Sequence, residues 1–131
     1  MFTQICSLVL VALLWGCTNP ILKKNSTKIV DIKSSSQIEN FYLEVKYLFT
    51  NLSYMIPFIV NQLGSVMYFI ALQNIDISLA LPVANSLTFV FTAIVGWILG
   101  EELPKTNVIL GILMIFTGTA LCTYAKQLNA N

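Results

Sequence analysis

Long apolar stretches alternate with short polar connections along this chain. Four stretches without a charged side chain cover residues 5–22, 55–73, 79–99 and 106–124. Each has about 18–21 residues, the length that a helix needs to cross a hydrocarbon core about 30 Å thick. Every Lys, Asp and Glu lies in a connection or beyond the end of a stretch. The pattern predicts an all-α, multi-pass membrane protein, a single domain over residues 1–131 built as a bundle of four transmembrane helices.

The first stretch is expected to be kept as a span rather than removed as a signal peptide. The four residues before it carry no Lys or Arg, and no small-x-small cleavage site follows it. Its helix is expected to end near Pro20, just before Lys23 and Lys24. We therefore count this stretch as the first of the four spans.

The connection over residues 23–54 is the only long one, and its second half has a helical pattern. Its apolar residues recur at the spacing of one helix face: Ile38, Phe41, Tyr42, Val45, Leu48 and Phe49. Glu39, Glu44 and Lys46 lie elsewhere on the helix surface. This predicts a short amphipathic helix. It either lies in the membrane interface or docks as a cap over the mouth of the bundle.

The other connections are short and suggest the topology. Residues 74–78 join the second and third spans, which predicts a tight antiparallel hairpin. Five lysines lie in the first connection and one in the third, so both should face the cytosol, with the two termini outside. Glycosylation sequons begin at Asn25 and Asn51, and they have meaning only if the first connection is lumenal. Use of the sequons stays open.

Small residues are the first guide to helix contacts, because apolar side chains give helices in lipid no reason to associate. The third span has Gly96 and Gly100 four residues apart, and the fourth span has Gly111 and Gly118 seven apart. Both spacings place the two glycines on one helix face. We interpret these glycines as a helix-packing or dimer face.

Polar residues inside the spans are the second guide, since each needs a partner or a polar solute. Asn85, Thr88 and Thr92 share a face of the third span with Gly96. Asn61 and Ser65 share a face of the second span, whereas Gln62 points about 100° away from Asn61. Packing and solute binding both remain open for this group. The residues considered to line a substrate path are Asn61, Gln62, Ser65, Asn85, Thr88 and Thr92, with Trp15 as a stacking surface.

Composition argues against several kinds of function. The chain is 10% charged with a net charge of +1, and its lysines form no basic stripe for nucleic acid. It has no His, no acidic cluster and no phosphate-binding glycine loop. We therefore expect no metal site, no cofactor and no enzymatic activity. The expected surroundings are the lipid bilayer and other membrane helices.

Several motifs resemble those of membrane transporters. Leu-Pro-Val-Ala-Asn-Ser at 81–86, followed by Gly-Glu-Glu at 100–102 and a glycine-bearing helix, resembles the repeats of the drug/metabolite transporter superfamily. Over all four spans the chain more closely resembles the transmembrane protein 234 family. The matching segments are Ala-Leu-Leu-Trp-Gly-Cys-Thr-Asn-Pro at 12–20, Leu-Lys-Lys at 22–24, Met-Ile-Pro-Phe at 55–58 and Asn-Gln-Leu-Gly-Ser at 61–65.

The four-span layout is also similar to that of small multidrug resistance exporters. Those exporters work as dimers and depend on a Glu inside the first membrane helix. The corresponding region here reads Leu13-Leu14-Trp15, so this carboxylate is absent. The resemblance therefore implies a transporter-like fold and a homodimer, but it does not imply proton-coupled drug export.

The sequence leads to one functional hypothesis and two alternatives. In the first, the protein moves a neutral or weakly polar small solute, and four helices enclose the path only as a homodimer. In the second, it is a non-transporting accessory or structural membrane protein that assembles with a membrane protein partner through its small-residue faces. In the third, it is a repeat that a second chain completes into a larger transporter.

Overall fold

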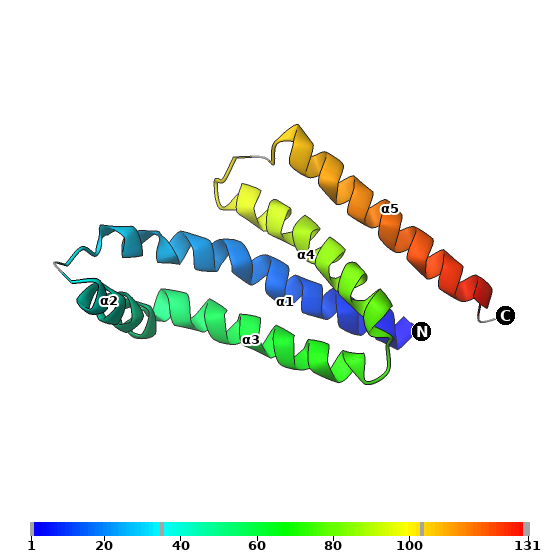
Figure 1. Cartoon of the computed structure of the whole chain (residues 1–131), viewed down its shortest axis with the longest axis horizontal. Helices are drawn as coiled ribbons and strands as arrows, with labels where there is room; N and C mark the ends of the chain where they lie inside the picture. The colour runs from blue at the N-terminus through cyan, green and yellow to red at the C-terminus, as the bar shows by residue number, and fades with distance from the viewer. Residues whose placement is uncertain (1, 35, 103, 130–131) are drawn as a thin grey trace.

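The computed structural model describes residues 2–34, 36–102 and 104–129, and every regular element in these ranges is a helix. Four helices are long and apolar enough to cross a membrane, which confirms the predicted spans. The helices are α1 (Phe2–Ser26), the 3-10 helix η1 (Thr27–Asp31), α2 (Gln37–Thr50), α3 (Leu52–Leu72), α4 (Ile77–Ile98) and α5 (Thr106–Asn129). Figure 1 shows that the start of α1, the end of α5 and the α3–α4 turn lie at one end, opposite the end where α4 is followed by α5.

The first span is longer than predicted, because α1 passes through Pro20 and continues to Ser26. Proline removes one hydrogen bond of the helix, a loss that a membrane helix tolerates when neighbouring groups occupy the freed backbone region. Asn61 of α3 bonds the side chains of Thr18 and Asn19, directly before the proline, and these bonds hold this part of α1 against α3. The expected end of the helix near Pro20 was therefore wrong.

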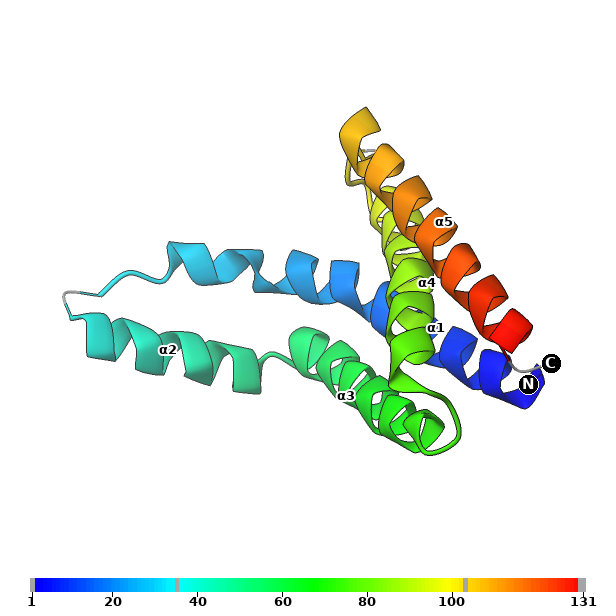
Figure 2. The ribbon, with the colours of Figure 1, turned by 45° about the vertical axis from the view of Figure 1, so that its right-hand side comes forward.

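The bundle is organised around α1, which packs against α3 on one side and α4 on the other. Figures 1 and 2 show α1 passing between these two helices, with α5 outermost beside α4. A short turn joins α3 to α4, and beside it Ala71 of α3 shares a buried cluster with Ala80 and Ala84 of α4. Beyond the turn α1 lies between the two helices. The short connection is confirmed, but the two spans do not pack along their length as a tight hairpin would.

Small side chains let these helices approach one another. The buried hydrophobic residues include Val11 and Ala12 of α1, Ala71 of α3, and Ala80 and Ala84 of α4. The large apolar side chains of the outer faces point away from the bundle, as Phe69 and Met114 do at 68% exposure each. Such a surface suits lipid, and it explains how the chain folds with a core of small residues.

The predicted amphipathic helix is present as α2. Its apolar face is largely exposed, with Ile38 and Phe41 at 83% and 69% exposure, and its main packing partner among the described helices is α3. Figure 2 shows α2 extending away from the other helices beside the end of α1. The alternative of a cap over the bundle mouth is therefore wrong, and an exposed apolar face fits the membrane interface.

Candidate functional site

The contact between α1 and α3 is built on Trp15 and Gly64. The Trp15 indole N–H donates to the carbonyl of Asn61 over 3.2 Å, and its ring lies 5.3 Å from the Tyr68 ring. A Cβ added to Gly64 would lie 2.9 Å from two atoms of the indole. Gly64 therefore provides the space that the Trp15 ring occupies. The structure places Trp15 between two helices, and not on an open stacking surface.

Asn61 is the polar centre of the same contact. Its amide N–H donates to Thr18 Oγ1 at 2.7 Å and to Asn19 Oδ1 at 3.1 Å. Thr18 is only 5% exposed and donates in turn to the carbonyl of Leu14. Asn61 thus faces α1, and its amide N–H groups are already used within the protein. It holds two helices together and leaves little for a solute to bind.

The contact between α1 and α4 depends on Gly16. A Cβ there would lie 2.9 Å from the carbonyl oxygen of Thr88 and 3.2 Å from the amide nitrogen of Thr92, and closer still to Phe91 Cβ. The neighbouring atoms are backbone and Cβ atoms, which cannot move aside independently of α4. Gly16 is therefore the point of closest approach between the two helices, and the sequence hypothesis did not include it.

The predicted polar face of α4 divides into an inner and an outer part. Thr88 is buried and donates to the carbonyl of Ala84 in its own helix. Asn85, a candidate for the substrate path, is exposed on the outside of α4 within one chain. Gln62 of α3 is exposed as well, whereas Ser65 is half-buried. Asn85 and Gln62 each lie on a helix side that α1 does not cover, so one chain alone does not bring them together with Thr88.

The hollow that does contain predicted residues lies between α4 and α5, and we call it the α4–α5 groove. It has a volume of about 470 Å³. Thr92 and Gly96 of α4 and Gly111 of α5 belong to its wall, and the Thr92 Oγ1 atom is buried without a hydrogen-bond partner among the described residues. The other lining residues are mainly apolar: Phe89, Ala93, Trp97, Glu101, Glu102, Pro104, Val108, Ile112 and Ile115.

A carboxylate closes the loop end of this groove. Gly100 has a φ of +89°, and the N–H groups of Gly100 and Glu101 donate to the carbonyls of Trp97 and Gly96. This helix ending needs glycine at the left-handed position. It turns Glu101 back over Gly96, where an added Cβ would meet Glu101 Oε2 at 3.0 Å. The Gly100–Glu101 sequence thus determines where the rim charge lies.

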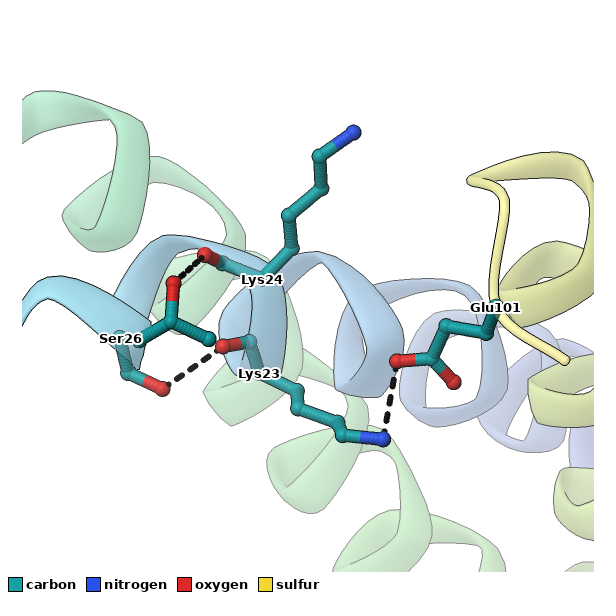
Figure 3. Close-up of polar contacts among 5 residues, drawn as sticks. Lys23, Lys24, Ser26 and Glu101 are labelled. Atoms are coloured by element: carbon teal, nitrogen blue, oxygen red, sulfur yellow. Dashed lines mark hydrogen bonds and ion pairs between the residues drawn. The ribbon is translucent and has the colours of Figure 1, made fainter.

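Lys23 at the end of α1 pairs with Glu101 across 2.9 Å, as Figure 3 shows. The two side chains are 71% and 39% exposed, so water and salt weaken the attraction. In Figure 3 the Lys24 side chain points away from Glu101. The pair connects α1 to the α4–α5 loop and neutralises the carboxylate at the rim.

Removing the rim ion pair should have a small effect on stability. Lys23→Gln, Glu101→Gln and the double variant should give a coupling energy of about 0.2–1 kcal/mol, the usual range for exposed pairs. Thermal unfolding in detergent at low and high salt measures it, and the coupling should shrink as salt rises. A coupling above about 2 kcal/mol, insensitive to salt, would contradict the assignment of an exposed pair.

A second groove of about 590 Å³ lies at the opposite end, near the start of α1 and the α3–α4 turn. Gln4 donates to the carbonyl of Asn74 there, and Asp76 pairs with Lys126 of α5. The charges of that groove therefore neutralise each other. Across both ends, no three His, Cys, Asp or Glu side chains in the described ranges come together as metal ligands.

Comparisons with known proteins agree on one family. The family described as "Putative transmembrane family 234" matches residues 8–123. The chain is 41% identical over 124 residues to a "Transmembrane protein 234 homolog" of Anopheles gambiae, covering 95% of this chain and 89% of that protein. It is 39% identical over 123 residues to a homologue of the same name from Dictyostelium discoideum, covering 94% and 96%. No solved structure matches the chain.

Proposed function

This chain belongs to the family described as Putative transmembrane family 234, and on that premise we propose that it moves a small solute along the α4–α5 groove. Membership confirms the resemblance drawn from the sequence, and a multi-pass membrane protein is established by the four apolar helices. Transport, and descent from the drug/metabolite transporter superfamily, are parts of the proposal. The motifs at 81–86 and 100–102 support that descent.

The observation that carries the proposal is the unpartnered hydroxyl in the groove wall. Thr92 Oγ1 is buried and has no hydrogen-bond partner in the described part of the chain, whereas Thr88 one turn earlier bonds its own helix. A polar group buried without a partner costs about 1–3 kcal/mol. If the Thr92 side chain turns its hydroxyl into the groove, a solute group that bonds it recovers this free energy, and binding is favoured at this position.

The walls of the groove indicate the kind of solute. Glu101 and Glu102 lie at the loop end, and every other lining residue is uncharged. Away from that end, where Lys23 pairs with Glu101, the wall has no charge to repay the desolvation of a charged solute, which is large in a medium of low dielectric. The proposed substrate is therefore a neutral or weakly polar small molecule. Because the spans carry no ionisable carboxylate, we propose that it moves down its own gradient.

A second candidate function rests on Trp15 and Asn61. These two residues were candidates for the substrate path, and both are occupied in joining α1 to α3. Polar groups used in this way fit an accessory or structural membrane protein that holds a rigid shape for a partner. The two functions differ in one property. Only the transporter offers the α4–α5 groove to a solute.

A ligand-stabilisation screen on detergent-purified protein tests the transporter. A solute present at a hundredfold excess over its dissociation constant stabilises the folded state by about 2.7 kcal/mol. Thr92→Val should reduce that stabilisation because it removes the hydroxyl, whereas Thr88→Val should preserve it. Thr88→Val is the matched control, since it makes the same chemical change outside the groove.

Two outcomes would contradict the proposal. A broad metabolite panel that stabilises none of the well-folded samples would support the accessory function instead. If a solute instead stabilised Thr92→Val as much as the wild type and failed to stabilise Thr88→Val, its binding site would lie outside the groove. Flux of the stabilising compound into proteoliposomes, compared between wild type and Thr92→Val, then tests movement as distinct from binding.

A further inference from the structure

Asn85 has a polar side chain where the membrane offers it no partner. It is the ninth residue of the 22-residue helix α4, so it lies near the middle of the span. Its side chain is exposed, and it makes no hydrogen bond to any other residue in the described ranges. Lipid tails cannot bond an amide, and an unsatisfied polar group in the hydrocarbon costs several kcal/mol. The amide therefore indicates a partner outside this chain.

The surface beside Asn85 continues onto α5. Ser86 and Thr119 lie 3.2 Å apart through their hydroxyl oxygens, which places Asn85 and Gly118, their immediate neighbours, at the same depth. A Cβ at Gly118 or at Gly111 would have no heavy atom within 4 Å. Among the described helices, α5 packs mainly against α4. Its glycine face is therefore free to receive another helix.

The same surface includes the α4–α5 groove. Phe89 and Thr92 follow Asn85 at steps of four and three, so the three residues lie along one side of α4. Gly111 of α5 lines that groove, and Gly118 lies two helical turns further on the same face. Asn85, the groove and the two glycines thus form one continuous open surface, which we call the Asn85 face.

We propose that a second copy of this chain covers the Asn85 face, with a two-fold axis passing beside Asn85. An asparagine amide carries two donors and an acceptor, so two of them related by a two-fold axis satisfy each other. A two-fold interface uses the same patch on both subunits, as this pairing requires. The glycines of α5 permit the close approach of backbones that membrane helices need in order to associate.

The charge pattern determines the direction of the axis. Five lysines in the first connection orient every copy the same way in the membrane, with that connection on the cytosolic side. Two copies of equal orientation can be related only by an axis along the membrane normal. The dimer is therefore parallel, and each residue of the Asn85 face meets its counterpart at equal depth.

This inference extends the proposed function, because a second copy would convert the open α4–α5 groove into an enclosed path. The dimer itself does not depend on transport. Its readout is the association of chains, whereas the readout of the proposed function is stabilisation by a solute. A dimer that no solute stabilises would favour the accessory function. A monomer that binds a solute would support the proposed function and contradict this interface.

Cysteine cross-linking in native membranes tests the arrangement. Cys6, Cys17 and Cys122 are first replaced by alanine, and a single cysteine is then introduced by Leu81→Cys, on the Asn85 face one turn before Asn85. A short bifunctional thiol reagent should join two Leu81→Cys chains. Phe69→Cys is the matched control, since Phe69 is 68% exposed on α3, outside the Asn85 face, and should not cross-link.

The competing arrangements give different products. In an antiparallel dimer about Asn85, Leu81 would lie opposite Phe89, and cross-links would form only when Leu81→Cys and Phe89→Cys chains are mixed. That product would overturn the parallel dimer. Cross-linking of Phe69→Cys in place of Leu81→Cys would overturn the interface, and so would a cross-linking yield near zero for both.

A second measurement uses the otherwise unmodified chain. Asn85→Leu should weaken dimerisation by about eightfold, because the symmetric pair loses two interhelical hydrogen bonds of about 0.6 kcal/mol each. Gly118→Leu should weaken it more, by tenfold or above, because it blocks the approach of the helices. Both variants should keep the helix content and thermal unfolding of the monomer. A dimer of unchanged affinity in both variants would overturn the proposal.

Discussion

Gly16→Val is expected to destabilise the folded chain by about 3 kcal/mol, the upper end of the usual cost of overpacking. The added side chain would meet the Thr88 carbonyl at 2.9 Å, together with Phe91 Cβ and the Thr92 amide nitrogen. Because these atoms belong to the backbone and the first side-chain carbon of α4, only a displacement of the whole helix relieves the clash. Equilibrium unfolding in mixed detergent, followed by circular dichroism, measures the loss.

The matched control for this prediction is Gly118→Ala. A Cβ at Gly118 has open space within one chain, and exchanging glycine for alanine inside a helix usually stabilises it by about 1 kcal/mol. The stability of the diluted monomer should therefore stay equal or rise. If Gly16→Val were as mild as Gly118→Ala, α1 and α4 would not approach each other at Gly16, and the central position of α1 would be disproved.

The spans could be predicted from the sequence because the bilayer limits their length and composition. Residues 5–22 and 106–124 stand out as charge-free stretches, and the structure contains helices there. The pairing of helices could not be predicted in the same way. In lipid, pairing follows from the complementary shapes of two surfaces, and Gly16 has meaning only once Phe91 lies opposite it.

The pairing of helices also decides which polar residues of the spans become buried. Spacing correctly predicted that Asn61 and Gln62 face different ways, and the structure shows Asn61 half-buried and Gln62 exposed. For α4, spacing placed Asn85, Thr88 and Thr92 on one broad face. The structure shows that α1 covers only the Thr88 side of it. Which side of a face becomes buried depends on the neighbouring helix, and the spacing within a single span does not contain that information.

The charged residues at the rim of the α4–α5 groove could be predicted only in part from the sequence. Glu101 and Glu102 were visible in the sequence as loop acids, but neither was included among the candidate site residues. Their place at the groove follows from Gly100, whose positive φ turns the chain back over Gly96. The Gly-Glu dipeptide at a helix end is a local signal that predicts this turn. The partner Lys23 lies 78 positions earlier and is brought close only by the fold.

Trp15→Ala is expected to lower stability by about 3 kcal/mol, the lower end of the cost of removing a large buried aromatic side chain. The indole fills the space above Gly64, contacts the Tyr68 ring and donates to the Asn61 carbonyl. Its loss leaves a cavity between α1 and α3 and removes a hydrogen bond. Unfolding in mixed detergent gives the free energy, and Trp15→Phe should recover part of it because the ring is kept.

Trp97→Ala is the matched control for stability alone, because Trp97 is 59% exposed on α4, in the wall of the α4–α5 groove. Its removal should change stability by no more than about 0.5 kcal/mol. The pair of variants also separates the two functions proposed for Trp15. If Trp15→Ala were as stable as Trp97→Ala but no longer stabilised by a solute, the indole would be a stacking surface for that solute. A large loss of stability in Trp15→Ala alone assigns it to the α1–α3 contact, where Gly64 and Asn61 hold it.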